Sequence, residues 1–187
     1  MFIQTEPTPN PATLKFLPGQ TVLATGALEY RSKESAAKAP LAEALLSIAG
    51  VESVMFGQDF VSVTKSDVEW AHLKPAVLGI IMEHFSSRAP LLVGDGETHG
   101  GAAEFFDPEQ AETVAKIKEL IETRVRPAVA GDGGDIIFKG FRDVVVYLKM
   151  KGACSGCPSS TATLRNGIQN LLKHFLPDVQ AVESIEG

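Results

Sequence analysis

Two cysteines are the residues of this chain best suited to metal or redox chemistry, and both lie in one short loop. Cys154 and Cys157, the only cysteines in the sequence, occur in the run Gly152-Ala153-Cys154-Ser155-Gly156-Cys157-Pro158. Thiolates at this spacing can bind one soft metal from the same side. A structural zinc ion or an iron–sulfur cluster usually takes four thiolates, so one chain carries half a set of ligands. Either the pair performs disulfide chemistry, or a second copy of the chain supplies the other two ligands.

The position of the loop favours the thiolate form of both cysteines. A valine-rich run that we expect to be a strand precedes the loop, and a helix is expected to begin just after it. Free amides and the dipole at a helix N-terminus stabilise negative charge, so we expect a lowered thiol pKa. Lys149 and Lys151 lie just upstream and would add to this effect. Gly152 and Gly156 permit the turns that aim both sulfurs one way, and Pro158 stiffens the entry to the helix.

The loop alone admits four interpretations. The two thiols could be structural and bind nothing. They could form a thioredoxin-like redox pair in which Cys154 attacks and Cys157 resolves, although Ala153 stands where such motifs generally have an aromatic residue. A zinc ion or an iron–sulfur cluster shared between two chains would use the same four sulfurs. None of the four histidines, at positions 72, 84, 99 and 174, lies beside the loop in sequence. We favour the shared iron–sulfur cluster.

Composition and charge exclude several classes of protein. The chain has 187 residues, of which 44% are hydrophobic and 21% charged, as in a soluble globular protein of one domain or two small ones. Residues 1–85 carry 6 Lys/Arg and 9 Asp/Glu, residues 86–107 carry 1 and 4, and residues 108–187 carry 10 and 10. The segment charges of −3, −3 and 0 add to the net charge of −6. This pattern offers no basic face, so nucleic acid is not an expected partner.

The sequence shows no membrane or targeting segment. No apolar run approaches the length of a membrane span, and the residues after Met1 lack the basic and apolar regions of a secretory signal. They also lack the Arg-rich character of a mitochondrial transit peptide. We therefore expect no membrane association.

The fold class predicted is α+β, in two small domains joined by a flexible acidic linker. The first domain spans residues 1–85, where we expect a strand at 13–17, a helix at 40–48, a hairpin around Gly57-Gln58-Asp59 and a helix at 67–85. The linker spans residues 86–107 and is rich in glycine and acidic residues. No helix or strand is predicted within it.

The second domain spans residues 108–187 and surrounds the cysteine loop. A helix is expected from Asp107 to Val125, because apolar residues recur there at helical spacing after a proline in the first turn. A tight turn at 131–135, two strands at 136–138 and 144–148, a helix at 160–175 and a strand at 179–185 follow. The glycine-rich turn leads into a strand rather than a helix, so we interpret it as structural and not as a phosphate loop. Asp132 and Asp135 are interpreted as turn residues that bond locally.

Both halves of the chain resemble a known family, the Nfu/NifU iron–sulfur scaffolds. The second domain is similar to the C-terminal domain of NifU-type scaffolds in the runs Gly131-Asp132-Gly133-Gly134-Asp135 and Gly152-Ala153-Cys154-Ser155-Gly156-Cys157-Pro158-Ser159-Ser160. The first domain is similar to the Nfu N-terminal domain in the runs Phe2-Ile3-Gln4-Thr5, Thr8-Pro9-Asn10-Pro11, Leu14-Lys15-Phe16 and Val54-Met55-Phe56-Gly57-Gln58-Asp59-Phe60. The resemblance covers nearly the whole chain in the right order, which makes it more specific than the CxxC motif alone.

The resemblance implies a scaffold or carrier of [4Fe-4S] clusters, which is not an enzyme. The family holds the cluster between the CxxC loops of two protomers, so Cys154 and Cys157 of each chain of a homodimer would be the metal ligands. Upstream iron–sulfur assembly proteins would supply the cluster, and recipient apo-proteins would receive it. A thiol–disulfide oxidoreductase that uses the same two cysteines is the alternative function.

The expected location is a bacterial cytoplasm. The resemblance implies relatives in mitochondria and in many bacteria, and this chain starts at Met1 directly on its first domain. The alternative is the mitochondrial matrix, if the chain is a processed form.

Overall fold

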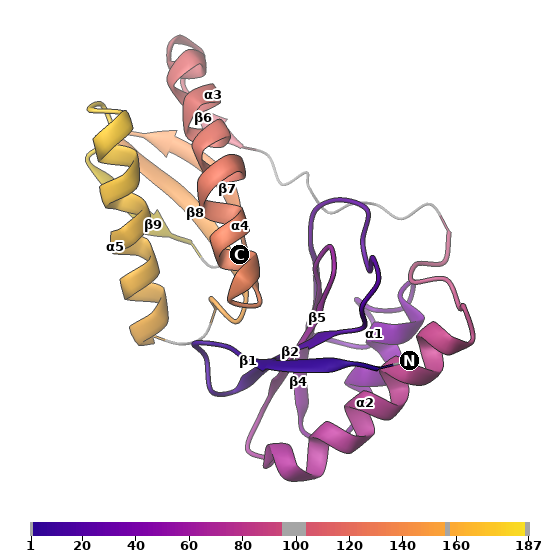
Figure 1. Ribbon diagram of the computed structural model, residues 1–187. Helices are drawn as coiled ribbons and strands as arrows, with labels where there is room; N and C mark the ends of the chain where they lie inside the picture. The colour runs from indigo at the N-terminus through magenta and orange to yellow at the C-terminus, as the bar shows by residue number, and fades with distance from the viewer. Residues whose placement is uncertain (1, 95–103, 156–157, 186–187) are drawn as a thin grey trace. The chain divides into compact units, whose positions relative to one another are not determined.

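The chain folds as two compact units, each with its own sheet and hydrophobic core (Figure 1). The computed structural model describes residues 2–94, 104–155 and 158–185. The N-terminal unit comprises Met1–His99 and the C-terminal unit Gly100–Gly187. Because each unit combines helices with one sheet, the predicted α+β fold class is confirmed.

The N-terminal unit is built on a five-stranded sheet in the order β1-β2-β5-β4-β3. Every neighbouring pair of strands is antiparallel. β4 and β5 form the hairpin predicted from the sequence, and the Gly57 N–H donates to the Phe60 carbonyl at 2.9 Å across its turn. The five strands are β1 (Gln4–Pro7), β2 (Thr13–Leu17), β3 (Leu28–Tyr30), β4 (Val51–Phe56) and β5 (Val61–Lys65).

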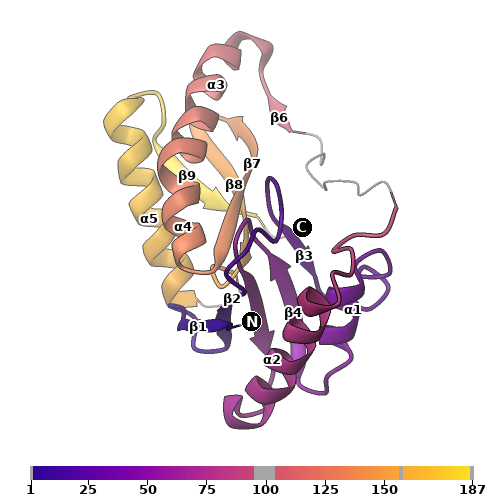
Figure 2. The ribbon, with the colours of Figure 1, turned by 45° about the vertical axis from the view of Figure 1, so that its right-hand side comes forward.

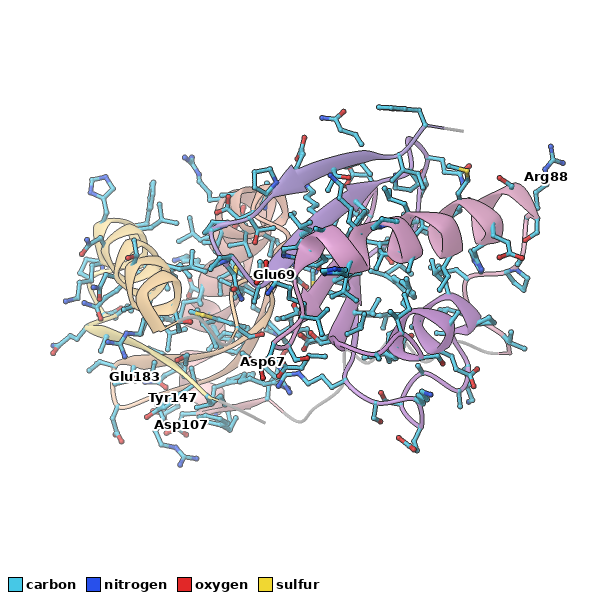
Figure 3. All side chains as sticks on the ribbon, turned by 90° about the horizontal axis from the view of Figure 1, so that it is seen from below. Asp67, Glu69, Arg88, Asp107, Tyr147 and Glu183 are labelled. Carbon is cyan, nitrogen blue, oxygen red and sulfur yellow. The ribbon has the colours of Figure 1, made fainter. Side chains whose placement is uncertain are left out.

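Two helices pack on this sheet, α1 (Pro40–Leu46) and α2 (Trp70–Ser86). Pro40 lies in the first turn of α1, where its missing N–H leaves no helical bond unmade. Glu69, directly before α2, and Arg88, two residues after it, mark the two ends of that helix in Figure 3. The core contains buried side chains from both helices and from alternate strand positions: Phe16, Leu41, Leu45, Val54, Phe56, Val61, Val63, Val77 and Ile81.

The C-terminal unit has a four-stranded sheet in the order β6-β7-β8-β9. The central pair is antiparallel, whereas both outer strands run parallel to their neighbours. β6 lies inside the segment 86–107, for which the sequence predicts no element. There Phe105 packs against Gly140, and its ring centroid lies 5.2 Å from that of Tyr147. The strands are β6 (Phe105–Phe106), β7 (Gly134–Arg142), β8 (Val145–Gly152) and β9 (Ala181–Ser184).

A run of short helical segments and one long helix lie side by side over one face of this sheet (Figures 1 and 2). Their buried residues meet inward side chains of β7 and β8, including Ile136 and Leu148. In the described ranges, no helix combines the length and the apolar character that crossing a bilayer requires. The segments are η1 (Pro108–Gln110), α3 (Ala111–Leu120), η2 (Ile121–Val125) and α4 (Arg126–Gly131), and the long helix is α5 (Pro158–Phe175).

The segment η2 is a π-helical turn, so the prediction of one regular helix up to Val125 is wrong here. The Arg126 N–H donates to the carbonyl of Ile121, five residues back. Pro127 explains the wider turn, because it has no N–H to offer the carbonyl of Thr123. A π turn inserts one residue, which rotates everything after it by about 100°. Arg126 therefore points in a direction that a continuous α-helix would not give it.

A tight turn at Asp143 and Val144 connects β7 to β8 and also positions β9. Both residues have φ in the left-handed region, 51° and 60°, as a two-residue hairpin turn requires. The Val144 carbonyl accepts hydrogen bonds from the N–H groups of Gln180 at 2.8 Å and Ala181 at 3.4 Å. β9 then runs parallel to β8 after the crossover through α5.

Burial of His84 makes the stability of the N-terminal unit depend on pH. His84 is 9% exposed, and none of the described residues gives its Nε2 atom a hydrogen bond. This burial lowers the pKa of His84 below its usual 6.5. Below that pH the unfolded chain binds more protons than the folded unit. Stability that is fully present above about pH 6.5 is therefore lost as the pH falls toward the folded-state pKa.

Fluorescence of Trp70 can measure this loss in the N-terminal unit alone. Trp70 is the single tryptophan, and its Nε1 donates to the Pro11 carbonyl at 3.2 Å. We expect a lower urea midpoint at about pH 5.5 than at about pH 7.5, and a smaller difference in His84→Leu. The exposed His72 provides the control, since His72→Leu should keep the full difference. An unchanged pH dependence in His84→Leu would contradict the role given to His84.

Candidate functional site

Cys154 lies two residues after the end of β8, with its side chain in the hydrophobic core of the C-terminal unit. It is 6% exposed. Cys157, the other cysteine of the sequence motif, lies outside the described residues. The geometry of the site is therefore built from Cys154 and the segments that hold it.

Backbone and hydroxyl groups fix the loop around Cys154 on three sides. The Ala153 N–H donates to the Gly133 carbonyl at 3.2 Å. The Gly152 carbonyl accepts bonds from the N–H and the Oγ of Ser155, at 3.1 and 2.9 Å. From α5, the Thr161 hydroxyl donates to the carbonyl of Cys154 at 3.0 Å. These bonds tie the loop to the turn before β7, to the end of β8 and to the helix that follows.

The glycine-rich turn before β7 forms the surface against which Cys154 packs. Gly133 has a φ of 76°, which favours glycine, and it leads into β7 at Gly134. A Cβ atom added to Gly134 would overlap the Sγ of Cys154 and lie 2.9 Å from the Lys151 carbonyl oxygen. The two motifs that the sequence analysis singled out, the glycine-rich turn and the cysteine loop, are therefore in contact.

The environment of Cys154 favours the thiol, so the expectation of a lowered pKa is wrong for this cysteine. Burial, together with the smaller effect of the nearby carboxylates of Asp132 and Asp135, raises the pKa of Cys154 to about 12. The influence of a helix dipole falls off within the first turn and does not offset burial in an apolar core. Lys151, which we expected to help, is itself 7% exposed. A bound metal ion would reverse this balance, because it deprotonates a coordinating thiol.

An ion pair beside the loop was not anticipated from the sequence. Arg126, the first residue of α4, donates from Nε and Nη2 to the two carboxylate oxygens of Asp135, at 2.8 and 3.0 Å. Its Nη1 donates to Glu122 at 2.6 Å. Burial of Asp135 at 5% exposure shows that it is more than a turn residue with local bonds. A carboxylate directly before an apolar strand is the signal that could have indicated a buried partner.

The described residues offer Cys154 as one soft ligand, and the sequence adds Cys157 three positions later. In the part of the chain that the structure describes, no three His, Cys, Asp or Glu side chains gather as a metal site. His174 lies near the far end of α5, about 24 Å along the helix from its start at Pro158. The described residues place Cys154 between the end of β8 and the start of α5.

Comparison with known families matches both halves of the chain. Residues 3–88 match the family model described as "Scaffold protein Nfu/NifU N terminal". Residues 117–183 match the model described as "NifU-like domain". The second match contains both the glycine-rich turn and the cysteine loop.

Individual proteins are similar over almost the whole chain. The human protein named "NFU1 iron-sulfur cluster scaffold homolog, mitochondrial" is 49% identical over 187 residues, which are 99% of this chain and 72% of that protein. "NifU-like protein 4, mitochondrial" of Arabidopsis thaliana is 48% identical over 98% of this chain and 65% of that protein. A solution structure of a NifU-like protein from Saccharomyces cerevisiae aligns with a TM-score of 0.46 at 24% identity, over 51% of this chain and 87% of that one.

These relatives correct the expected location. The human and plant proteins are named as mitochondrial, so the expectation of a bacterial cytoplasm is wrong. That expectation rests on the start of the sequence at Met1, directly on the first domain. The position at which a sequence begins does not report where the protein is sent, because leaders are removed from mature chains.

Proposed function

Because the chain belongs to the Nfu/NifU family of iron–sulfur cluster scaffold proteins, we propose that it binds a [4Fe-4S] cluster and transfers it to apo-proteins. The family predicted from the sequence is thereby confirmed. Cys154 and Cys157 of two protomers would supply the four cluster ligands. The proposed role is to bind and transfer the cluster, and it assigns no catalytic residue to the chain.

The observation that supports this proposal is that Cys154 lies in a constrained loop. The loop of Cys154 is held by bonds to the turn before β7, to the end of β8 and to α5, and the chain contains one further cysteine, three positions later. Four thiolates then require two chains, with the cluster joining them as a homodimer. Such a cluster can be released when the pair separates, because each chain alone holds half of its ligands.

The two units would divide the work of the carrier. We infer an N-terminal domain at 1–85, a linker at 86–107 whose last residues include β6 of the second sheet, and a cluster-binding domain at 108–187. The cysteine loop and its supporting turn both lie in the cluster-binding domain. The N-terminal domain would contact partner proteins, which are the upstream assembly proteins and the recipient apo-proteins.

Anaerobic reconstitution with iron and sulfide tests the proposal. We expect broad visible absorption, a Mössbauer spectrum of a [4Fe-4S] cluster and about two irons per chain, since four irons are shared by two chains. Native mass measurement should find two chains per cluster. Small thiols must be left out, so that they cannot fill vacant ligand positions.

Two other results would refute the proposal and point elsewhere. Metal-independent turnover of a disulfide substrate by a monomer would indicate an oxidoreductase. A colourless metal whose removal unfolds the C-terminal unit would indicate a structural zinc site.

A further inference from the structure

The ion pair between Arg126 and Asp135 is the best-organised polar contact near the cysteine loop. The guanidinium uses three of its N–H groups, two on Asp135 at 2.8 and 3.0 Å and one on Glu122 at 2.6 Å. Two parallel bonds to one carboxylate fix its orientation as well as its distance. Because Asp135 is buried, loss of the guanidinium would leave a buried carboxylate without its charged partner. The pair is therefore unlike the exposed ion pairs of the same unit, such as Glu112 with Lys116.

Asp135 lies where β7 meets the cysteine loop. It pairs with Lys151 across β7 and β8, and the preceding Gly134 pairs with Gly152. Gly134 is in contact with Cys154, and the Gly133 carbonyl accepts the hydrogen bond of the Ala153 N–H. A shift of Asp135 would therefore move the backbone against which Cys154 is packed.

The π turn gives Arg126 the direction that this contact requires. Arg126 follows η2 directly, and its own N–H closes the wide turn on Ile121. Its side chain reaches Asp135, nine residues later in the chain and beyond the turn at the end of α4. A regular helix would rotate Arg126 by about 100° away from this position. The π turn therefore orients Arg126 for its ion pair with Asp135.

We propose that Arg126 is a positioning residue for Cys154, which acts through Asp135 to hold the start of β7 against the cysteine loop. The inference rests on the proposed function, because a fixed position of the Cys154 sulfur matters only if it binds the cluster and releases it at a controlled rate. Loss of Arg126 would loosen the loop without removing any ligand. A loosened loop should release the cluster faster.

The test compares three variants of the full chain: Arg126→Met, Arg126→Lys and Val182→Ala. Methionine removes charge and hydrogen bonds, and lysine keeps the charge but loses the two-pronged contact. Val182 is a core residue of β9, so Val182→Ala lowers the stability of the same unit at another place. Two rates are measured, hydrogen exchange of the Ala153 amide in the metal-free protein and transfer of iron from the reconstituted cluster to a chelator.

We expect both rates to rise about tenfold in Arg126→Met and by a smaller factor in Arg126→Lys, with little change in Val182→Ala. Equal rates in Arg126→Met and Val182→Ala at matched thermal stability would overturn the proposal. Faster exchange at Ala153 with unchanged cluster release would also overturn it. If Arg126→Met does not fold, Arg126→Lys decides. If the protein without substitutions takes up no cluster, the proposed function is refuted instead. Hydrogen exchange of the Ala153 amide would still show whether Arg126 holds the loop.

Discussion

The Cys154→Ser protein is expected to bind no iron–sulfur cluster, and the Cys157→Ser protein is expected to behave in the same way. In a symmetric pair, either change removes two of the four thiolates at once. A serine hydroxyl is a poor replacement, because it stays protonated where a cysteine thiol can be deprotonated by the metal. Iron and sulfide analysis after anaerobic reconstitution should find essentially none of the cluster that the unchanged protein binds.

The fold should survive the change at Cys154. Burying a hydroxyl in place of the thiol costs about 1–3 kcal/mol, which lowers the stability of the C-terminal unit without unfolding it. Ser155→Ala provides the control, since it removes the hydroxyl bond to the Gly152 carbonyl in the same loop and keeps both thiols. Cluster binding at the normal level in Cys154→Ser would exclude Cys154 as a ligand.

Gly134→Ala is expected to destabilise the C-terminal unit and to weaken cluster binding together. The added Cβ atom would lie 2.9 Å from the Lys151 carbonyl oxygen and 3.2 Å from the Cβ of Cys154, in addition to overlapping its sulfur. Overpacking of this kind costs about 1–3 kcal/mol, because the strands and the loop must move apart. Urea unfolding followed by circular dichroism measures the loss, and reconstitution measures the cluster.

Gly131→Ala is the matched control, with the same substitution three residues earlier. Gly131 ends α4, and a Cβ atom there would meet nothing within 4 Å. Alanine in a helix is favoured over glycine by about 0.5–1 kcal/mol, so this variant should be slightly more stable. Similar effects of the two variants would mean that contact with Cys154 does not limit residue 134.

The strands and helices that carry their own apolar pattern could be predicted from the sequence. β2, the hairpin of β4 and β5, and the helices α1 and α5 all follow alternation or helical spacing. β1 and β3 could not, because they are short edge strands whose structure comes from pairing with β2 and β4. β6 could not be predicted either, because its two residues form a strand by pairing with β7.

The π turn could not be predicted from apolar spacing, because it preserves the spacing from which a helix is predicted. Ile117, Ile121, Val125 and Val129 are all buried at steps of four residues. In a regular α-helix each such step drifts by about 40° around the axis, so the last of them would leave the core. The wide turn takes up this drift. Pro127 was the sign available in the sequence, because its missing N–H interrupts the regular ladder.

The cysteine loop could be predicted from the sequence, but its surroundings could not. Spacing and count of the cysteines are properties of the sequence, whereas burial of Cys154 depends on how β7, β8 and α5 pack around it. The same packing brings Asp132 and Asp135 near the sulfur and reverses the expected direction of its pKa. Arg126 could not be predicted as the partner of Asp135. Their contact depends on the π turn, and no local sequence pattern indicates the turn and the ion pair together.

The parallel pairing of β8 with β9 has a consequence for how the protein is made. The ribosome synthesises β8 about thirty residues before β9. Until β9 has been added, one edge of β8 has no paired strand and the core of the C-terminal unit lacks Val182. All the strands and helices described in the N-terminal unit have been synthesised by Ser86. During translation the sheet of the C-terminal unit is therefore completed after that of the N-terminal unit, when β9 pairs with β8.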